Sequence, residues 1–325
     1  MKVLITGGMG VIGAMTTRKF VQEGHRPVVM ARHMDKNLIG PIEDKIDVEL
    51  ADVQDFPRII SIIQNYKITH IVHTAALVGA ISSKNPPQSI HVNVVGTVNI
   101  AEAARIMKVQ RVVYTSAKGV YGYISGEYAH PTYRPLPEDH PKNPVRIYDS
   151  GKLMGEHIGE FYHRTYGLEF LSLRFGMTFG PGKMVRHGGM AVTSQIVELP
   201  FARKPVRIEK GGEQKDDFIY TKDVGLSIYL ATIAEKPRYT AYNISMGVGY
   251  TLNDMADAVR KAIPGADISV GPGLQFLEGP YHSIYDTTRA REDLKFKPEF
   301  NMETAVPDYV ETLKQLAAGQ ERYVL

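Results

Sequence analysis

The sequence predicts an α/β protein built on a doubly wound parallel sheet, with a smaller C-terminal lobe beside it. In the first 175 residues, short runs that are wholly apolar alternate with segments of helical spacing. Strands that are apolar on both faces are typical of parallel sheets covered by helices on both sides. After residue 176 glycine and proline become dense and the segments shorten. This change indicates a lobe that covers the carboxyl ends of the strands, where such sheets bind ligands.

The individual elements follow from the spacing of apolar residues. The runs predicted to form strands are Val3–Thr6, Val28–Ala31, Val48–Ala51, Ile71–Thr74, Val112–Thr115 and Leu171–Phe175. The segments predicted to form helices between them are Ala14–Gln22, Phe56–Gln64, Pro87–Met107 and Ser150–Thr165. In the second lobe, helices are expected over Leu252–Ala262 and Met302–Leu316.

Composition excludes several classes of protein and ligand. The 325 residues carry a net charge of +3 without a run of Lys or Arg, which gives no support for nucleic-acid binding. The sequence has no cysteine, so disulfides and Cys-ligated zinc are excluded, and no metal site is predicted. No apolar run reaches ~18 residues, and the opening MKVLITGG is not typical of a signal peptide. A cytoplasmic protein with a small-molecule substrate and no membrane partner is expected.

The segment TGGMGVIG follows the first strand and opens the first helix. Gly7 permits a tight turn, Gly10 lets the backbone approach a pyrophosphate, and Gly13 lets the helix pack closely on the strand. The helix N-terminus, with Val11 and Ile12, would then face the phosphates. In this position the motif predicts a Rossmann domain that binds a dinucleotide.

The glycine loop and the change at residue 176 divide the chain by role. Residues 1–175 are assigned to the dinucleotide-binding Rossmann domain. Residues 176–325 are assigned mainly to a substrate-binding lobe, and a segment near 217–235 is expected to return to the first domain.

The end of the second strand bears on the choice between NAD and NADP. NAD-binding proteins of this kind place an acidic residue there, which accepts a hydrogen bond from the ribose 2′-hydroxyl. Here the strand ends at Ala31 and is followed by Arg32, which could pair with a 2′-phosphate in a bidentate manner. Alternatively, Arg32 is solvated or stacked on adenine, and Asp35 reaches back to the ribose. These residues favour NADP and leave NAD open.

Tyr148 and Lys152 are spaced i, i+4, so on a helix they share one face. Tyrosine has a pKa of about 10 and is a poor base at neutral pH. A nearby ammonium and a positive nicotinamide would both favour the phenolate. Tyr148 is therefore predicted to exchange a proton with the substrate oxygen, and Lys152 to assist it and to bind the nicotinamide ribose. After a dinucleotide loop, this pair is favoured over a surface pair without function.

These motifs together resemble the extended short-chain dehydrogenase/reductase family, the NAD-dependent epimerase/dehydratase group. Besides the glycine loop, the segments that carry the resemblance are HTAA at 73–76, HVNVVGT at 91–97, YDSGK at 148–152, LRFGMTFGPG at 171–182, DFIYTKDV at 217–224 and YDTTRAREDL at 285–294. The resemblance implies further cofactor contacts at Asp52, Val53, Ala75, Ala76, Asn93 and Phe175. For Asn93, support of Lys152 through water and a helix-capping or sheet-bridging role are equal alternatives. The resemblance also implies a homodimer formed through the helices at 87–107 and 150–165.

One catalytic residue of this family is absent from its usual place. The family carries a Ser or Thr five residues before the glycine of V-Y-G, and that position here is Ala117. Either Ser116 reaches in to hold the substrate oxygen, or Tyr148 holds it alone or with Lys118. The loss of such a donor costs ~10²–10³ in rate. The Asp–Glu pair of the family's sugar 4,6-dehydratases is replaced by Lys118 and Gly119, so that chemistry lacks its acid and base.

Two positions that bind the diphosphate of nucleotide sugars in the family also differ. Met177 replaces an Asn, and Asp216 replaces an Arg. The carboxylate of Asp216 is expected to repel a diphosphate, although other cations of the lobe could compensate. The sequence therefore favours NAD(P)-dependent interconversion of a secondary alcohol and a ketone on a small non-nucleotide substrate. If that substrate is acidic, Lys118, Lys183 or Arg186 would bind its anionic group. The alternatives are a nucleotide-sugar epimerase, which reduces its cofactor transiently, and a non-catalytic NAD(P)-binding sensor.

Overall fold

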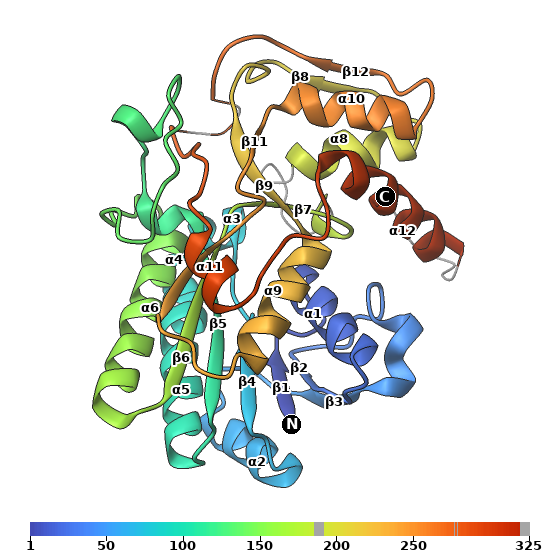
Figure 1. Cartoon of the computed structure of the whole chain (residues 1–325). Coiled ribbons are helices and arrows are strands. Elements are labelled where there is room, and N and C mark those ends of the chain that lie inside the picture. Colours follow the sequence, from blue (N-terminus) through green and yellow to red (C-terminus); the bar gives the residue numbers. More distant parts are fainter. Residues whose placement is uncertain (185–191, 276, 278, 319–325) are drawn as a thin grey trace.

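A seven-stranded parallel sheet forms the centre of the molecule, seen in a computed structural model that describes residues 1–184, 192–275, 277 and 279–318 (Figure 1). The strand order is β10-β6-β5-β4-β1-β2-β3. The strands are β1 Val3–Thr6, β2 Val28–Ala31, β3 Asp47–Leu50, β4 His70–His73, β5 Arg111–Ala117, β6 Glu169–Phe175 and β10 Ala241–Ile244. The sequence predicted six of these strands close to their observed bounds. The seventh, β10, comes from the second half of the chain and pairs with β6 in parallel.

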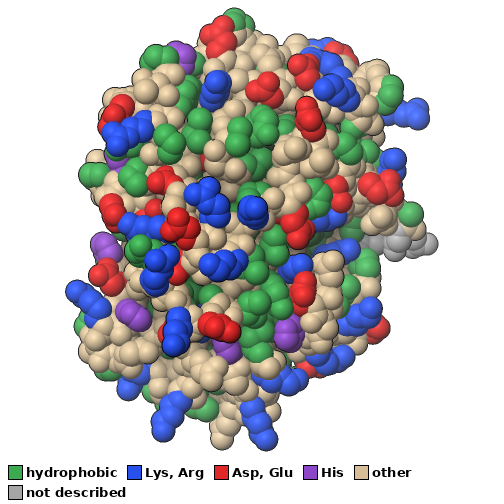
Figure 2. Space-filling model, viewed as in Figure 1, with side chains coloured by type: hydrophobic (Ala, Val, Ile, Leu, Met, Phe, Trp, Pro, Cys, Tyr) green, Lys and Arg blue, Asp and Glu red, His purple; other side chains and the backbone are tan. Residues whose placement is uncertain are grey.

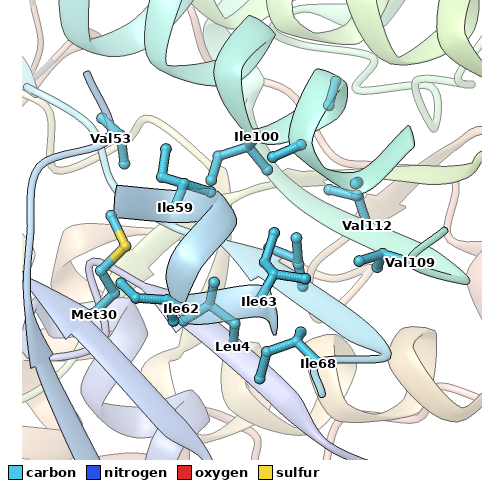
Figure 3. Packing of buried hydrophobic residues seen from close by; sticks show 14 of the residues in the cluster. Leu4, Met30, Val53, Ile59, Ile62, Ile63, Ile68, Ile100, Val109 and Val112 are labelled. Carbon is cyan, nitrogen blue, oxygen red and sulfur yellow. The ribbon is translucent and has the colours of Figure 1, made fainter. Parts of the chain in front are cut away.

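Helices cover both faces of this sheet, because alternate residues of each strand point to opposite sides. Leu4 of β1 points to the face covered by α2, α5 and α6, and its neighbours Val3 and Ile5 point to the face covered by α1 and α9. The bounds of these helices are α1 Val11–Gln22, α2 Phe56–Tyr66, α5 Gly96–Ile106, α6 Ile147–Tyr166 and α9 Thr221–Ile233. Figure 3 shows how Ile59 and Ile63 of α2 pack with Leu4 and with Ile100 of α5. The doubly wound fold predicted from the sequence is confirmed.

The helix predicted over 87–107 is interrupted. Its parts are α4 Pro86–Ile90, a π-helical turn at His91–Val95 and then α5. Such π-turns insert one residue into a helix and re-aim the side chains around them. Asn93 lies in this turn. A short helix, α3 Gly79–Lys84, precedes α4.

The second lobe lies above the carboxyl ends of the strands (Figure 1). It contains a three-stranded sheet of order β11-β9-β7 and a pair formed by β12 and β8. Its strands are β7 Met177–Phe179, β8 Val206–Ile208, β9 Asp216–Tyr220, β11 Gly249–Tyr250 and β12 Ile268–Val270, and its helices are α8 Val192–Phe201, α10 Leu252–Ala262 and α12 Met302–Ala318. The short helix α11 Thr288–Asp293 packs beside β10. The helices expected at 252–262 and 302–316 are confirmed.

The molecular surface carries mixed charge. Figure 2 shows Lys and Arg side chains interspersed with Asp and Glu across one face, without a continuous basic area on that face. Among the helices of the described residues, none is long and apolar enough to cross a membrane.

Candidate functional site

A cavity of about 1090 Å³ runs along the carboxyl ends of the strands, between the sheet and the second lobe. At one end it is lined by the glycine loop and the residues after β2, and at the other by Tyr148, Met177 and Asp216. Ligands of doubly wound sheets bind in such a crevice at the point where the strand order reverses, which here lies between β1 and β4.

The glycine loop is shaped for close approach by a phosphate. Gly7 has φ +65°, and a side chain there would come within 2.8 Å of the Ala75 backbone. A Cβ on Gly13 would lie 2.1 Å from the carbonyl oxygen of Gly7. Both positions therefore require glycine, and the first turn of α1 remains open toward the cavity. Val11, Ile12 and Gly13 line the cavity, as expected, so these residues fit a dinucleotide pyrophosphate.

The expected adenosine end is also formed by residues on the cavity wall. Arg32 is exposed and makes no hydrogen bond or ion pair within the described part of the chain, and Asp35 borders the same end of the cavity. Asp52 accepts a hydrogen bond from the Gln54 backbone (2.9 Å), which fixes its carboxylate beside buried Val53. The other expected contacts on this wall, Ala75, Ala76 and Phe175, line the cavity.

Asn93 is the exception among the expected cofactor contacts. Its amide oxygen accepts from the backbone N–H of Leu77 (2.8 Å), and its amide nitrogen donates to the Leu77 carbonyl (2.9 Å) and to Ser89 Oγ (3.2 Å). Asn93 is buried and is not part of the cavity wall. Asn93 therefore has the alternative, structural role and not that of a cofactor contact. Its buried amide connects the π-turn to the segment after β4 through hydrogen bonds.

Tyr148 and Lys152 lie side by side on the first turns of α6, and both line the cavity. The Lys152 ammonium donates to the Thr115 carbonyl (2.6 Å) and lies 5.7 Å from the centre of the Tyr148 ring. Burial lowers the pKa of Lys152 to about 7. Burial, with a smaller contribution from Asp149, raises the pKa of Tyr148 above its usual value.

These shifts correct one expectation about the pair. A partly neutral Lys152 cannot supply the full positive charge that the sequence reasoning assigned to it. Burial therefore favours the neutral phenol of Tyr148 over its phenolate. Further positive charge has to arrive with a ligand before the phenolate is favoured.

No hydroxyl at the end of β5 is available to hold a substrate oxygen. Ser116 Oγ donates to Glu156, whose carboxylate also accepts from Arg174 (2.6 Å), and Thr115 Oγ1 donates to the His73 carbonyl (3.2 Å). The strand keeps its regular register with β6 as far as Ala117, so the segment is not shifted along the chain. Ser116 lines the cavity, but its hydroxyl proton is already donated to Glu156, so we expect another residue to hold the substrate oxygen.

Lys118 belongs to a buried charged cluster that sequence reasoning did not foresee. Its ammonium pairs with Asp216 and donates to the Ser283 carbonyl (3.0 Å), and His282 Nδ1 lies 2.9 Å from the other Asp216 oxygen. Burial works against ionisation, but Lys118 and His282 together hold the pKa of Asp216 below its usual value. Asp216 is thus an ionised carboxylate whose charge is balanced, so the expected repulsion of anions by this residue is corrected. No motif marks His282 and Ser283; only the fold brings them here.

The space around Gly119 also excludes the acidic residue that 4,6-dehydratase chemistry needs. A Cβ at Gly119 would lie 1.9 Å from a carboxylate oxygen of Asp149. An acidic side chain therefore cannot replace Gly119 without displacing Asp149, which is buried and bonded to Arg146 (2.9 Å).

The remaining substrate candidates lie at the same end of the cavity. Met177 of β7 and Lys183 of the following loop line it, and Lys183 is buried. Arg186 lies outside the described residues.

Comparison with known proteins gives a consistent result. The model of the "NAD dependent epimerase/dehydratase family" matches residues 3–245. A UDP-glucose 4-epimerase of Mycolicibacterium smegmatis is 30% identical and covers 96% of this chain and 98% of its own. Two solved structures share the fold. One is the UDP-glucose 4-epimerase of Thermus thermophilus in complex with NAD (TM-score 0.80, 23% identity, covering 97% of this chain and 99% of its own). The other is the L-threonine dehydrogenase of Clostridium difficile (TM-score 0.83, 23% identity, covering 97% and 98%).

Proposed function

Because this chain belongs to the NAD-dependent epimerase/dehydratase family and is an enzyme of the extended short-chain dehydrogenase/reductase type, we propose that it oxidises or reduces a small, non-nucleotide substrate. The reaction is the interconversion of a secondary alcohol and a ketone, with NAD or NADP as the partner. The non-catalytic sensor is not proposed again, since the chain belongs to a family of enzymes.

The observation that carries this proposal is the buried pair of Lys118 and Asp216 on the cavity wall. Relatives that bind nucleotide sugars are expected to use a cation in place of Asp216. Here a carboxylate lies there and balances the charge of Lys118, so this pair offers no net positive charge to a diphosphate. Met177, which replaces an amide, adds no hydrogen-bond donor. Both features support a substrate without a nucleotide.

The same pair provides a donor for the reacting oxygen. An ammonium has three hydrogens, and Lys118 uses two of them for Asp216 and Ser283. The third is available to the cavity that Lys118 lines. Because Asp216 already neutralises Lys118, this donor suits a neutral carbonyl or hydroxyl oxygen whose negative charge grows during the reaction.

The remaining roles follow from the geometry of α6. Tyr148 exchanges a proton with the substrate oxygen, and Lys152, held by the Thr115 carbonyl, binds the nicotinamide ribose and moderates Tyr148. The nicotinamide, when bound, accepts or supplies the hydride. Its positive oxidised form would favour the phenolate that the protein alone disfavours.

A structural neighbour shows that this fold is compatible with a small substrate. The L-threonine dehydrogenase of Clostridium difficile has this fold, and its name describes oxidation of a small, non-nucleotide alcohol. At 23% identity the likeness concerns the fold alone, and it shows that this fold can serve a reaction on a small substrate.

The second candidate is a nucleotide-sugar epimerase, favoured by the 30% identity to the Mycolicibacterium smegmatis enzyme over almost the whole chain. Asp216, balanced by Lys118, does not repel a diphosphate, although the neutral pair does not attract one either. On this reading the cofactor is reoxidised in each cycle and no reduced nicotinamide accumulates.

A spectrophotometric screen tests the two readings against each other. The purified protein is given NAD⁺ or NADP⁺, first with pools of hydroxy acids, sugar acids, sugars and polyols, and separately with nucleotide sugars. Reduced nicotinamide is expected to accumulate with a pool of small compounds, and the preferred dinucleotide then reveals whether Arg32 selects NADP. Epimerised nucleotide sugar without net reduction would contradict the proposal and support the second candidate.

We also propose a homodimer through α5 and α6, which pack against each other. The exposed large apolar side chains on these helices are Val98, Ile106, Met154, Phe161 and Tyr166, an arrangement typical of an interaction surface. Light scattering is expected to give twice the chain mass of 36.2 kDa. The double variant Val98→Glu/Phe161→Glu is expected to be monomeric, whereas Val248→Glu, at an exposed apolar residue of the other lobe, stays dimeric. A monomeric wild type would contradict this.

A further inference from the structure

Within the described residues, Lys183 is a buried cation with no counter-ion. The buried Lys and Arg residues of the described chain are Arg111, Lys118, Lys152, Arg174 and Lys183. Arg111, Lys118 and Arg174 each form an ion pair with a carboxylate. Within the described residues, Lys152 and Lys183 form none, and both line the cavity. Lys152 is proposed to bind the nicotinamide ribose, whereas Lys183 has no role in the proposed reaction.

The environment of Lys183 is polar but uncharged. Its ammonium donates to the carbonyl and to the hydroxyl oxygen (3.2 Å) of Thr178, and the side chain is 5% exposed. Burial lowers its pKa to about 8, with no neighbouring charge acting on it. Buried charges in proteins are normally paired, because desolvation without a partner is costly. A negatively charged group of a bound ligand would offset the desolvation cost of the Lys183 ammonium.

The backbone just before Lys183 is bonded to the helices of the second lobe. Glu198 of α8 accepts a hydrogen bond from the Tyr309 hydroxyl of α12 with one carboxylate oxygen, and its other oxygen is buried without a partner in the described chain. Tyr309 in turn lies 2.7 Å from the Gly180 carbonyl oxygen. These contacts connect the Gly180 backbone, shortly before Lys183, to α8 and α12.

Thr178 adds a second donor at the same place. Its hydroxyl oxygen accepts from Lys183, so its own proton is available to a ligand, and Thr178 also lines the cavity. We propose that Lys183 and Thr178 form a binding site for an oxyanion, a carboxylate or phosphate group, of a ligand in this cavity. The anionic group could belong to the substrate, because Thr178 follows Met177 on β7. It could also belong to the dinucleotide, because Gly182 lies against Leu38, which follows β2 at the expected adenosine end.

This inference deepens the proposed function, because it would make the substrate a small anion, but its test needs no turnover. Thermal unfolding of the full chain is followed in sodium sulfate and in sodium malonate, against sodium chloride at equal ionic strength. The melting temperature of the wild type is expected to rise with either anion. Lys183→Met is expected to melt higher in chloride, since an unpaired buried charge is removed, and to lose the response to both anions.

Two further variants control for charge and folding. Lys204→Met removes the same charge from an exposed position of the same lobe and is expected to respond like the wild type. Lys183→Arg keeps the charge and is expected to keep the response. A response of Lys183→Met equal to that of the wild type would overturn the site, whatever the redox screen finds.

Calorimetric titration with NAD⁺ and NADP⁺ distinguishes the two sources of the anion. If the anion is a phosphate of the dinucleotide, Lys183→Met is expected to bind the dinucleotide about 10- to 100-fold more weakly, the loss typical of a charge-assisted hydrogen bond. If the anion belongs to the substrate, dinucleotide affinity is unchanged, and malonate still stabilises the wild type saturated with NAD⁺ or NADP⁺. Unchanged affinity without that added stabilisation would overturn the proposal.

Discussion

Replacement of Tyr148 by Phe is expected to lower turnover by about 10²–10⁴-fold. Tyr148 is the half-buried phenol on the cavity wall next to Lys152, and burial raises its pKa above the usual value. The variant keeps the ring and loses only the proton that the substrate oxygen needs. Binding of the dinucleotide should stay unchanged, because the ring still fills the same space. The measurement is kcat for the substrate found in the screen, with dinucleotide affinity from calorimetry.

Tyr281→Phe provides the matched control. Tyr281 also lines the cavity, and its ring lies 4.2 Å from the guanidinium carbon of Arg146. Loss of its hydroxyl should change kcat by less than about tenfold, since no proton transfer is assigned to it. If Tyr148→Phe retained nearly full turnover, another group would have to carry the proton, and the assignment of the Tyr148–Lys152 pair would fail.

Replacement of Lys118 by Met is expected to lower kcat by ~10²–10³, the usual loss when one donor to the reacting oxygen is removed. Ser116→Ala is expected to leave kcat within about tenfold of the wild type, because the Ser116 hydroxyl is already bonded to Glu156. The two variants therefore decide which residue replaces the hydroxyl missing at Ala117. A large loss in Ser116→Ala with a small loss in Lys118→Met would reverse the assignment.

The Lys118 experiment needs a variant that separates catalysis from folding. Lys118→Met leaves Asp216 buried and without its main partner, which typically costs about 3–5 kcal/mol of stability. The double variant Lys118→Met/Asp216→Asn removes both charges and is expected to melt closer to the wild type. Its kcat should remain as low as that of the single variant, since the donor is still absent. Recovery of kcat together with stability would mean that Lys118 has only a structural role.

Much of the fold could be predicted because its signals are local. A strand buried on both faces shows itself in four or five adjacent apolar residues, and β1, β2 and β6 appear close to where this pattern puts them. The seventh strand, β10, was missed, since Ala241–Ile244 lies in the lobe where the pattern is irregular. The π-turn at His91–Val95 was missed as well, because apolar spacing cannot detect one inserted residue.

The glycine loop and the Tyr148–Lys152 pair could be predicted from the sequence, because each motif lies within a few residues of a strand or a helix start. The tertiary structure alone decided what surrounds them. Ser116 is bonded to a residue 40 positions away, and Lys118 to residues 98 and 165 positions away. It also showed that Lys183 lies buried in the described chain without a carboxylate partner. Hydrogen bonds and charge pairs form over a few ångströms in space, and sequence separation does not reveal which residues the folded sheet brings within that range.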